Sequence, residues 1–208
     1  MIFVFSYQRE EMLRKVLTDI QGEDFVVLDD GSDFECENMI KFKHEGKQGF
    51  WKKWVKAFEI AKATKDDLFI FMGDDFLNID LERIKEIHSQ MRGAYVYNLI
   101  NDGRNTCWVS KEPIPHDENT DRVFFTDCGF FCNRKALQCI NWKVREVNPK
   151  RFNNRPEISS GVGQNFTMQF NTARVPMYRP NKSLAYHGDH ESVMHTELRK
   201  INPLISKL

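Results

Sequence analysis

Short runs of apolar residues alternate along the chain with longer stretches in which apolar residues recur every three to four positions. The runs at 2–5, 25–28 and 68–72 are continuous and rich in β-branched and aromatic side chains, which is typical of strands buried on both faces. Strands that alternate with helices in this way predict an α/β fold, in which helices flank both faces of a mostly parallel sheet. The periodicity predicts helices over residues 12–20, 51–61, 79–91, 159–173 and 193–200.

The second half of the chain is less regular than the first. Residues 94–100 and 123–133 have strand character, but the stretch between them is polar, lacks a period and contains two prolines, so we expect a loop over one end of the sheet. Pro176 could not donate to a central ladder, and residues 175–178 therefore predict an edge strand. Because no repeat, low-complexity tract or linker divides the chain, we expect a single domain over residues 1–208.

Composition narrows the classes of function. Thirty Lys and Arg balance thirty Asp and Glu, so no overall field favours a nucleic acid or an anionic membrane. The apolar N-terminal run has no basic segment before it, which predicts a strand rather than a signal peptide, and no stretch approaches the roughly 18 apolar residues of a membrane span. Five cysteines without a C-x-x-C pair favour a reducing compartment. We therefore expect a soluble, cytoplasmic protein with no nucleic-acid partner and no membrane span.

The chemistry of the chain centres on the stretch from Leu68 to Asp75. Five apolar residues run directly into Gly73, Asp74 and Asp75, so a buried strand delivers two carboxylates to the edge where open α/β sheets bind ligands. Adjacent carboxylates repel unless a cation lies beside them, and an oxygen-lined site suits Mg²⁺ or Mn²⁺. The alternative is that the two acids only form a turn and cap the next helix, although Asn78 or Asp80 is also expected to cap it.

Polar groups also follow the two earlier strands. The second strand runs into Asp29 and Asp30, and the first runs into a loop that ends at Arg9. Since the carboxyl ends of parallel strands share one edge, we expect the acids at 29–30 and at 74–75 to meet along one rim.

The loop at 44–50 opens the next helix. Gly46 and Gly49 allow a ligand to approach the backbone closely, and Lys47, Lys52 and Lys53 place positive charge near the helix start, where an anion is favoured. The alternative for these lysines is a solvated basic face of the helix.

Four segments along the chain, at residues 6–9, 27–33, 73–75 and 185–188, resemble in their order the GT-A-fold glycosyltransferases that use nucleoside diphosphate sugars. The segment Val27-Leu28-Asp29-Asp30-Gly31-Ser32-Asp33 is the most specific of them, because it is close to the family's V-D-D-G-S-x-D pattern, whose acids contact the base and ribose. The other three are Ser6-Tyr7-Gln8-Arg9, Gly73-Asp74-Asp75 and Ala185-Tyr186-His187-Gly188.

The resemblance implies a GT-A, Rossmann-like fold with a nucleotide-binding half over about residues 1–100 and an acceptor-binding half over about 101–208. Together with the charges at the helix start, it gives a set of residues that we expect to contact the nucleotide sugar. These are Ser6, Tyr7, Arg9, Asp29, Asp30, Gly49, Lys52 and Asp74.

The metal motif is incomplete. A full D-x-D motif would place an acid at Met72 or Gly73, so only Asp74 and Asp75 are present. By the family's E-D-D register, Asp75 is the direct ligand of Mn²⁺ or Mg²⁺, and Asp74 supports it. The histidine of the family's C-terminal loop corresponds to His187, which is implied as a further ligand.

The catalytic base has two candidates. Transfer with inversion requires a carboxylate that accepts the proton of the acceptor hydroxyl, and inverting members carry it near the start of a helix. Glu157 is the acid in the corresponding region, and Asp127, on the segment that resembles the acceptor-side strand, competes with it. Transfer with retention needs no such base, and the sequence leaves both outcomes open.

The function implied by the resemblance is metal-dependent transfer of a sugar from a nucleoside diphosphate sugar, with UDP-sugar favoured, to a hydroxyl of a glycan or glycoprotein acceptor. One alternative is a non-catalytic nucleotide- or glycan-binding module with a degenerate fold. Another is a sugar-phosphate nucleotidyltransferase, although residues 6–9 lack the glycines of its first loop. Palm-type polymerases also carry a Gly-Asp-Asp turn, but they require a strand to follow it in a hairpin, whereas residues 79–91 have helical periodicity.

Overall fold

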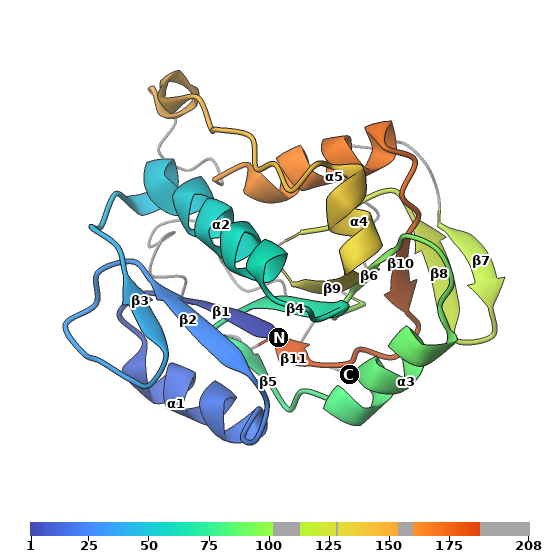
Figure 1. Ribbon diagram of the computed structural model, residues 1–208, viewed down its shortest axis with the longest axis horizontal. Coiled ribbons are helices and arrows are strands. Elements are labelled where there is room, and N and C mark those ends of the chain that lie inside the picture. The colour runs from blue at the N-terminus through green and yellow to red at the C-terminus, as the bar shows by residue number, and fades with distance from the viewer. Residues whose placement is uncertain (102–112, 128, 154–159, 188–208) are drawn as a thin grey trace, which may run out of the picture.

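The computed structural model describes residues 1–101, 113–127, 129–153 and 160–187. A single large sheet runs through this part of the chain (Figure 1). Its strands are β1 (Ile2–Ser6), β2 (Phe25–Asp29), β3 (Met39–Lys41), β4 (Leu68–Gly73), β6 (Val96–Asn98), β7 (Ile114–Asp117), β8 (Thr120–Val123), β9 (Phe130–Asn133) and β10 (Met177–Pro180). Their order across the sheet is β3-β2-β1-β4-β9-β6-β10-β8-β7.

Most strands of this sheet point the same way. Strands β3, β2, β1 and β4 form one parallel block. Strand β9 runs against its neighbours β4 and β6, and β8 runs against β10 and β7, while β6 and β10 are parallel to each other. Seven of the nine strands therefore share one direction. The expected mixed, mostly parallel α/β fold of the Rossmann-like type is confirmed.

Helices cover both faces of the sheet. In Figure 1, α2 (Gly46–Ala63), α4 (Arg134–Cys139) and α5 (Val162–Thr172) lie above it, and α1 (Glu10–Asp19) and α3 (Leu81–Gln90) lie below it. A short 3₁₀ helix, η1 (Pro149–Phe152), follows α4. None of the helices in the described ranges has both the length and the apolar composition that crossing a bilayer would require.

The central strands feed two hydrophobic cores, one on each face. Phe3 and Phe5 of β1 belong to the core under α2, α4 and α5, whereas Ile2 and Val4 belong to the core over α1 and α3. This alternation explains why these strands are continuous apolar runs. Trp54 of α2 is completely buried in the first core, where truncation of a tryptophan to alanine costs about 3–5 kcal/mol.

Two expectations from the sequence are wrong. Strand β10 is not an edge strand, because it lies between β6 and β8. Pro176 is accommodated because it precedes the strand. Its carbonyl oxygen accepts a hydrogen bond from the backbone N–H of Val96, and no donor is required of it. The stretch at 101–121 is not all loop, since β7 and β8 form a hairpin there. The helix expected over residues 193–200 lies outside the described residues.

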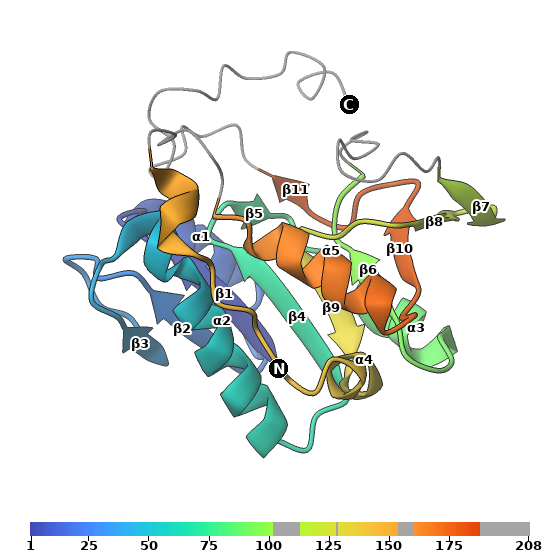
Figure 2. The same cartoon turned by 90° about the horizontal axis from the view of Figure 1, so that it is seen from above.

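A second, two-stranded sheet lies beyond the end of β4. It consists of β5 (Phe76–Leu77) and β11 (Tyr186–His187), which pair antiparallel and bring the C-terminal part of the described chain beside the Gly73-Asp74-Asp75 turn (Figure 2). A strand does follow this turn, as in palm-type polymerases. It pairs with β11 rather than folding back on β4, so the polymerase hairpin is not formed.

Candidate active site

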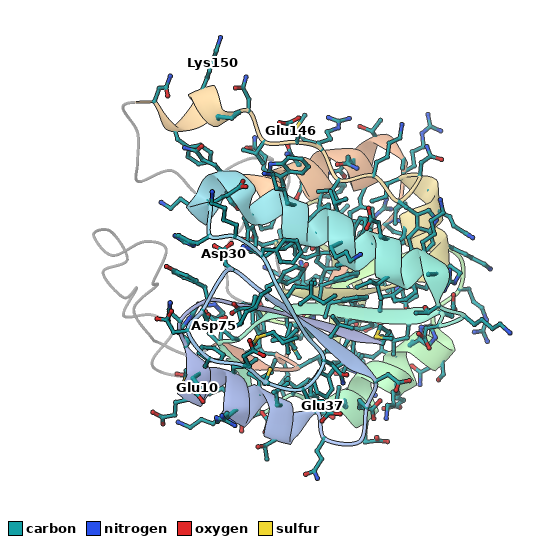
Figure 3. The ribbon with its side chains drawn as sticks, turned by 60° about the vertical axis from the view of Figure 1, so that its left-hand side comes forward. Glu10, Asp30, Glu37, Asp75, Glu146 and Lys150 are labelled. Carbon is teal, nitrogen blue, oxygen red and sulfur yellow. The ribbon has the colours of Figure 1, made fainter. Side chains whose placement is uncertain are left out.

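The ends of three parallel strands build the candidate site. The register pairs Ser6 of β1 with Asp29 of β2, and Phe5 of β1 with Gly73 of β4. The acids that follow β2 and β4 therefore lie on one edge of the sheet, two strand spacings or about 10 Å apart. Figure 3 shows Asp30 and Asp75 on this common edge.

Asp74 holds the loop between β1 and α1. Its side chain is 1% exposed, and its Oδ2 accepts hydrogen bonds from Ser6 Oγ at 2.9 Å and from the backbone N–H of Tyr7 at 3.2 Å. Arg9 Nη2 lies 3.1 Å from the other oxygen. Burial raises the pKa of Asp74 to about 7, against the opposing effects of Arg9, Ser6 and Tyr7. These contacts tie Asp74 to the loop between β1 and α1, and its direct contact with a nucleotide or metal stays a prediction.

Asp75 is the more exposed of the two acids, at 15% against 1% for Asp74. Its Oδ2 accepts a hydrogen bond from Arg9 Nη1 at 2.9 Å and lies 3.5 Å from His187 Nε2. Its Oδ1 packs against Gly73, where an added Cβ would lie 2.6 Å from that oxygen. This contact gives a physical reason for the incomplete metal motif, since an acid at position 73 would displace the carboxylate of Asp75.

His187 reaches the site through the small second sheet. The pairing of β5 and β11 sets His187 opposite Phe76, and the two rings pack edge to face with their centroids 5.1 Å apart. Within the described ranges, no group of three or more metal-binding side chains is formed. The carboxylate of Asp75 and the imidazole of His187 nevertheless fit a divalent cation that takes its remaining ligands from phosphate and water, as Mg²⁺ and Mn²⁺ commonly do.

Asp29 shapes the turn after β2. Its Oδ2 accepts from the backbone N–H groups of Gly31 and Ser32, and its Oδ1 accepts from Ser32 Oγ, at distances of 2.6–2.9 Å. The residue is completely buried. Both carboxylate oxygens are bonded within the turn, and the expected contact of Asp29 with the nucleotide stays a prediction.

Asp30 belongs to a buried ion pair that the sequence did not reveal. Its Oδ1 lies 2.5 Å from Lys53 Nζ, and its Oδ2 lies 2.9 Å from His44 Nδ1. Lys53 is only 2% exposed, and burial lowers the pKa of its ammonium group against the attraction of Asp30. The ring of Tyr7 stacks on the half-exposed ring of His44, with centroids 4.3 Å apart and planes 6° apart. Together these residues form a charged, aromatic wall beside the end of β2.

Lys52 and Gly49 do not have the positions that we expected. Lys52 Nζ forms an exposed ion pair with Glu45, at 2.6 Å, instead of facing the site. Gly49 leaves room for the side chain of Glu45, because an added Cβ would lie 2.5 Å from Glu45 Cβ. Lys53 is the lysine that reaches the site. The sequence indicates its burial, because it lies in the apolar stripe of α2, three residues after Phe50 and four before Ala57.

Asp127 lies at the start of α5. Its carboxylate packs so closely on Gly163, the second residue of that helix, that an added Cβ would clash with it. Two hydrogen bonds between Thr126 and Thr167 tie this segment to α5, at 3.0 and 2.9 Å. A helix start favours a negative charge, so the position suits a carboxylate. The other candidate base, Glu157, lies outside the described residues.

Comparison with known proteins places the fold. No protein-family model and no curated protein matches the chain. Among solved structures, the chain is similar to A197 from STIV at 15% sequence identity, with a TM-score of 0.51, over 91% of this chain and 85% of that one. It is also similar to a mycobacterial protein at 12% identity, with a TM-score of 0.55, over 91% of this chain and 67% of that one. At these identities the likeness shows the fold alone.

Proposed function

We propose that the protein is a metal-dependent glycosyltransferase that takes a sugar from a nucleoside diphosphate sugar, UDP-sugar by preference, and transfers it to a hydroxyl of a glycan or glycoprotein. The observation that carries the proposal is the pairing of Asp75 and His187 on the same sheet edge as the Asp30, Lys53 and His44 cluster. A nucleoside diphosphate needs both a cation for its phosphates and a polar, aromatic surface for its nucleoside, and this edge offers both within one small region.

The nucleoside end of the donor is assigned to the wall formed by Tyr7, His44 and Asp30. The stacked rings of Tyr7 and His44 present aromatic surface, on which a base gains about 1–3 kcal/mol by stacking. The buried pair of Asp30 and Lys53 fixes the floor beneath them. This assignment replaces the role that we expected for Lys52.

The diphosphate is assigned to the end of β4. Asp75 and His187 would hold the cation, which when bound offsets the charge that develops on the departing diphosphate. Arg9 is the positive side chain that contacts both Asp74 and Asp75, and it adds donors to the same region. In an inverting reaction Asp127 would accept the proton of the acceptor hydroxyl, with Glu157 as its competitor.

Calorimetry of UDP binding with and without Mn²⁺ tests the proposal. We expect UDP to bind the wild type with Mn²⁺ at least about tenfold more tightly than without it, a difference of 1.4 kcal/mol, and Asp75→Ala to remove this gain. Glu10→Ala is a matched control, because Glu10 is an exposed acid of α1 whose partner Arg14 is also exposed. Equal affinities under all these conditions would refute the proposal.

A non-catalytic binding module is the second candidate. It is favoured because few metal-binding side chains meet at the site. Within the described ranges these are Asp75 and His187. Hydrolysis of a panel of nucleotide sugars, measured with Mn²⁺ and without an acceptor, separates the two. A transferase is expected to hydrolyse at least one of them slowly, whereas a module binds without turnover.

A further inference from the structure

Arg9 clamps the two acids of the site together. Its guanidinium places Nη2 3.1 Å from Asp74 Oδ1 and Nη1 2.9 Å from Asp75 Oδ2. Arg9 immediately precedes α1, and its side chain is only 17% exposed. Two carboxylates and one guanidinium therefore share a small, partly desolvated volume, in which charge interactions are much stronger than in water.

The oxygen that Arg9 holds is the one that a metal would need. His187 Nε2 faces Asp75 Oδ2, the same atom that accepts from Arg9 Nη1, and Asp75 Oδ1 is packed against Gly73. A divalent cation shared by Asp75 and His187 would then lie beside the guanidinium, and the two positive charges would repel. Arg9 and the cation cannot both bind this oxygen well.

Arg9 has an alternative partner if an anion enters. Its Nε is buried and has no hydrogen-bond partner among the described residues, so the guanidinium keeps a free donor. Guanidinium groups bind phosphate strongly through two parallel hydrogen bonds, so a diphosphate would be a favourable partner for Arg9. Asp74 would remain held by Ser6 and Tyr7 after Arg9 leaves.

From this geometry we propose that Arg9 competes with the divalent cation for Asp75 in the nucleotide-free protein and moves to the diphosphate when a nucleotide binds. The nucleotide thereby releases Asp75 for the metal, and the two ligands bind cooperatively. By linkage, the metal then raises the affinity for the nucleotide by the same factor. The inference rests on the proposed function for its nucleotide, but the competition at Asp75 involves only this chain and the metal.

Two titrations on Arg9→Gln test the exchange. The first measures binding of Mn²⁺ alone, from the electron paramagnetic resonance signal of free Mn²⁺. We expect the variant to bind Mn²⁺ roughly tenfold more tightly than the wild type, the size of one charge-assisted hydrogen bond. The second measures UDP binding in EDTA by calorimetry, and there we expect the variant to bind about tenfold more weakly. Opposite changes identify an exchange, since general damage to the site weakens both.

Control variants fix the interpretation. In the double variant Arg9→Gln/Asp75→Asn, the gain in Mn²⁺ affinity should be abolished. That result would show that the metal binds at Asp75. Arg14→Gln removes the same charge from the exposed face of α1, where Arg14 pairs with Glu10, and should leave both affinities unchanged. If Arg9→Gln does not fold, Arg9→Lys replaces it, because one ammonium cannot span both acids, and a smaller gain in Mn²⁺ affinity is expected.

The outcomes separate this inference from the proposed function. Equal or weaker binding of Mn²⁺ by the folded Arg9 variants overturns the exchange, even if UDP binds. If the wild type does not bind UDP under any condition, the proposed function fails, and a gain in Mn²⁺ affinity would still establish the competition between Arg9 and the metal. If the wild type binds UDP and both Arg9 variants lose it without gaining Mn²⁺ affinity, Arg9 is only a phosphate ligand and the exchange is excluded.

Discussion

The neighbouring lysines of α2 lie in opposite environments. Lys53 is buried beside Asp30, whereas Lys52 is half exposed beside Glu45. Removing one partner of a buried ion pair leaves the other charge without compensation, which costs about 3–5 kcal/mol, whereas an exposed pair contributes about 0–1 kcal/mol. We therefore expect Lys53→Met to lower the free energy of unfolding by about 3 kcal/mol and Lys52→Met to change it by less than about 0.5 kcal/mol. Urea unfolding of the two variants makes the comparison, and similar losses in both would contradict the burial of Lys53.

Asp74 should make the stability of the protein depend on pH near neutrality. Burial raises its pKa from 3.8 to about 7 in the folded protein. Between these two values the folded protein holds a proton that the unfolded chain has released, so the free energy of unfolding falls as pH rises. For the step from pH 5 to pH 7 this loss is about 2 kcal/mol, at 1.36 kcal/mol per pKa unit.

Asp74→Asn tests this dependence, because asparagine has no proton to lose but can still accept from Ser6 and Tyr7. Urea unfolding at pH 5 and pH 7 should show a larger decline in the wild type than in the variant, by about 2 kcal/mol. An equal change in the wild type and the variant over this range would show that Arg9 outweighs burial and that the carboxylate is already ionised at pH 5.

The start of α5 offers a test at the scale of an element. Replacing a glycine inside a helix by alanine usually stabilises it, by about 1 kcal/mol. At Gly163 the new Cβ would displace the carboxylate of Asp127. If Asp127 is the catalytic base, we expect Gly163→Ala to lower the transfer rate at least about tenfold, which is part of the roughly 10²–10⁴-fold that general base catalysis contributes. We expect UDP affinity to stay within about twofold.

Asp127→Asn is the matched variant for this prediction. It removes the base but adds no atom to the helix, so both variants should lose transfer activity while they retain binding of UDP with Mn²⁺. An active Asp127→Asn enzyme would leave Glu157 as the base in an inverting reaction, or would indicate retention. If Gly163→Ala alone is inactive and its UDP binding is also lost, the clash has distorted the site as a whole.

The strands that could be predicted from sequence are those that are mostly buried. Strands β1, β2 and β4 are buried on both faces, so their apolar runs are unbroken, and their ends fixed the common edge of Asp30 and Asp75. The hairpin of β7 and β8 was missed because it is short and mostly polar, and all four residues of β7 are exposed. Strand β8 is specified by pairing with β10, and β7 by pairing with β8, rather than by their own patterns.

The site was predictable only in part, for a related reason. Which acids lie at strand ends follows from the order of elements, but which of their oxygens are free depends on packing across the loops. Asp29 is bonded within its own turn, and Asp74 is held by the loop between β1 and α1. Arg9 reaches the acids from the residue before α1, and Lys53 reaches Asp30 from α2. The burial of Lys53 is indicated in the sequence by its place in the apolar stripe of α2. Its partner, Asp30, depends on how the helix packs on the sheet.

At the scale of the whole molecule, the two expected halves of the chain are interleaved. Strand β9, from the second half, lies between β4 and β6 of the first, and β6 also pairs with β10. The core on the α2 side combines Phe71 of the first half with Phe130 and Phe166 of the second, and the rings of Phe71 and Phe130 lie 5.2 Å apart. Neither half can therefore complete its own core.

This interleaving predicts that a fragment of residues 1–100 does not fold alone. In that fragment β4 would be an exposed, apolar edge strand. The buried ring of Trp54 would also lose its contacts with Phe130 and Phe166, whose ring centroids lie 5.7 and 4.7 Å from its own. We expect the fragment to aggregate or to show no tertiary signal in near-ultraviolet circular dichroism, and the whole chain to unfold in one cooperative transition. A fragment that folds and binds UDP would show that the nucleotide-binding half is an independent unit. In that case the acceptor half would contribute to transfer but not to stability.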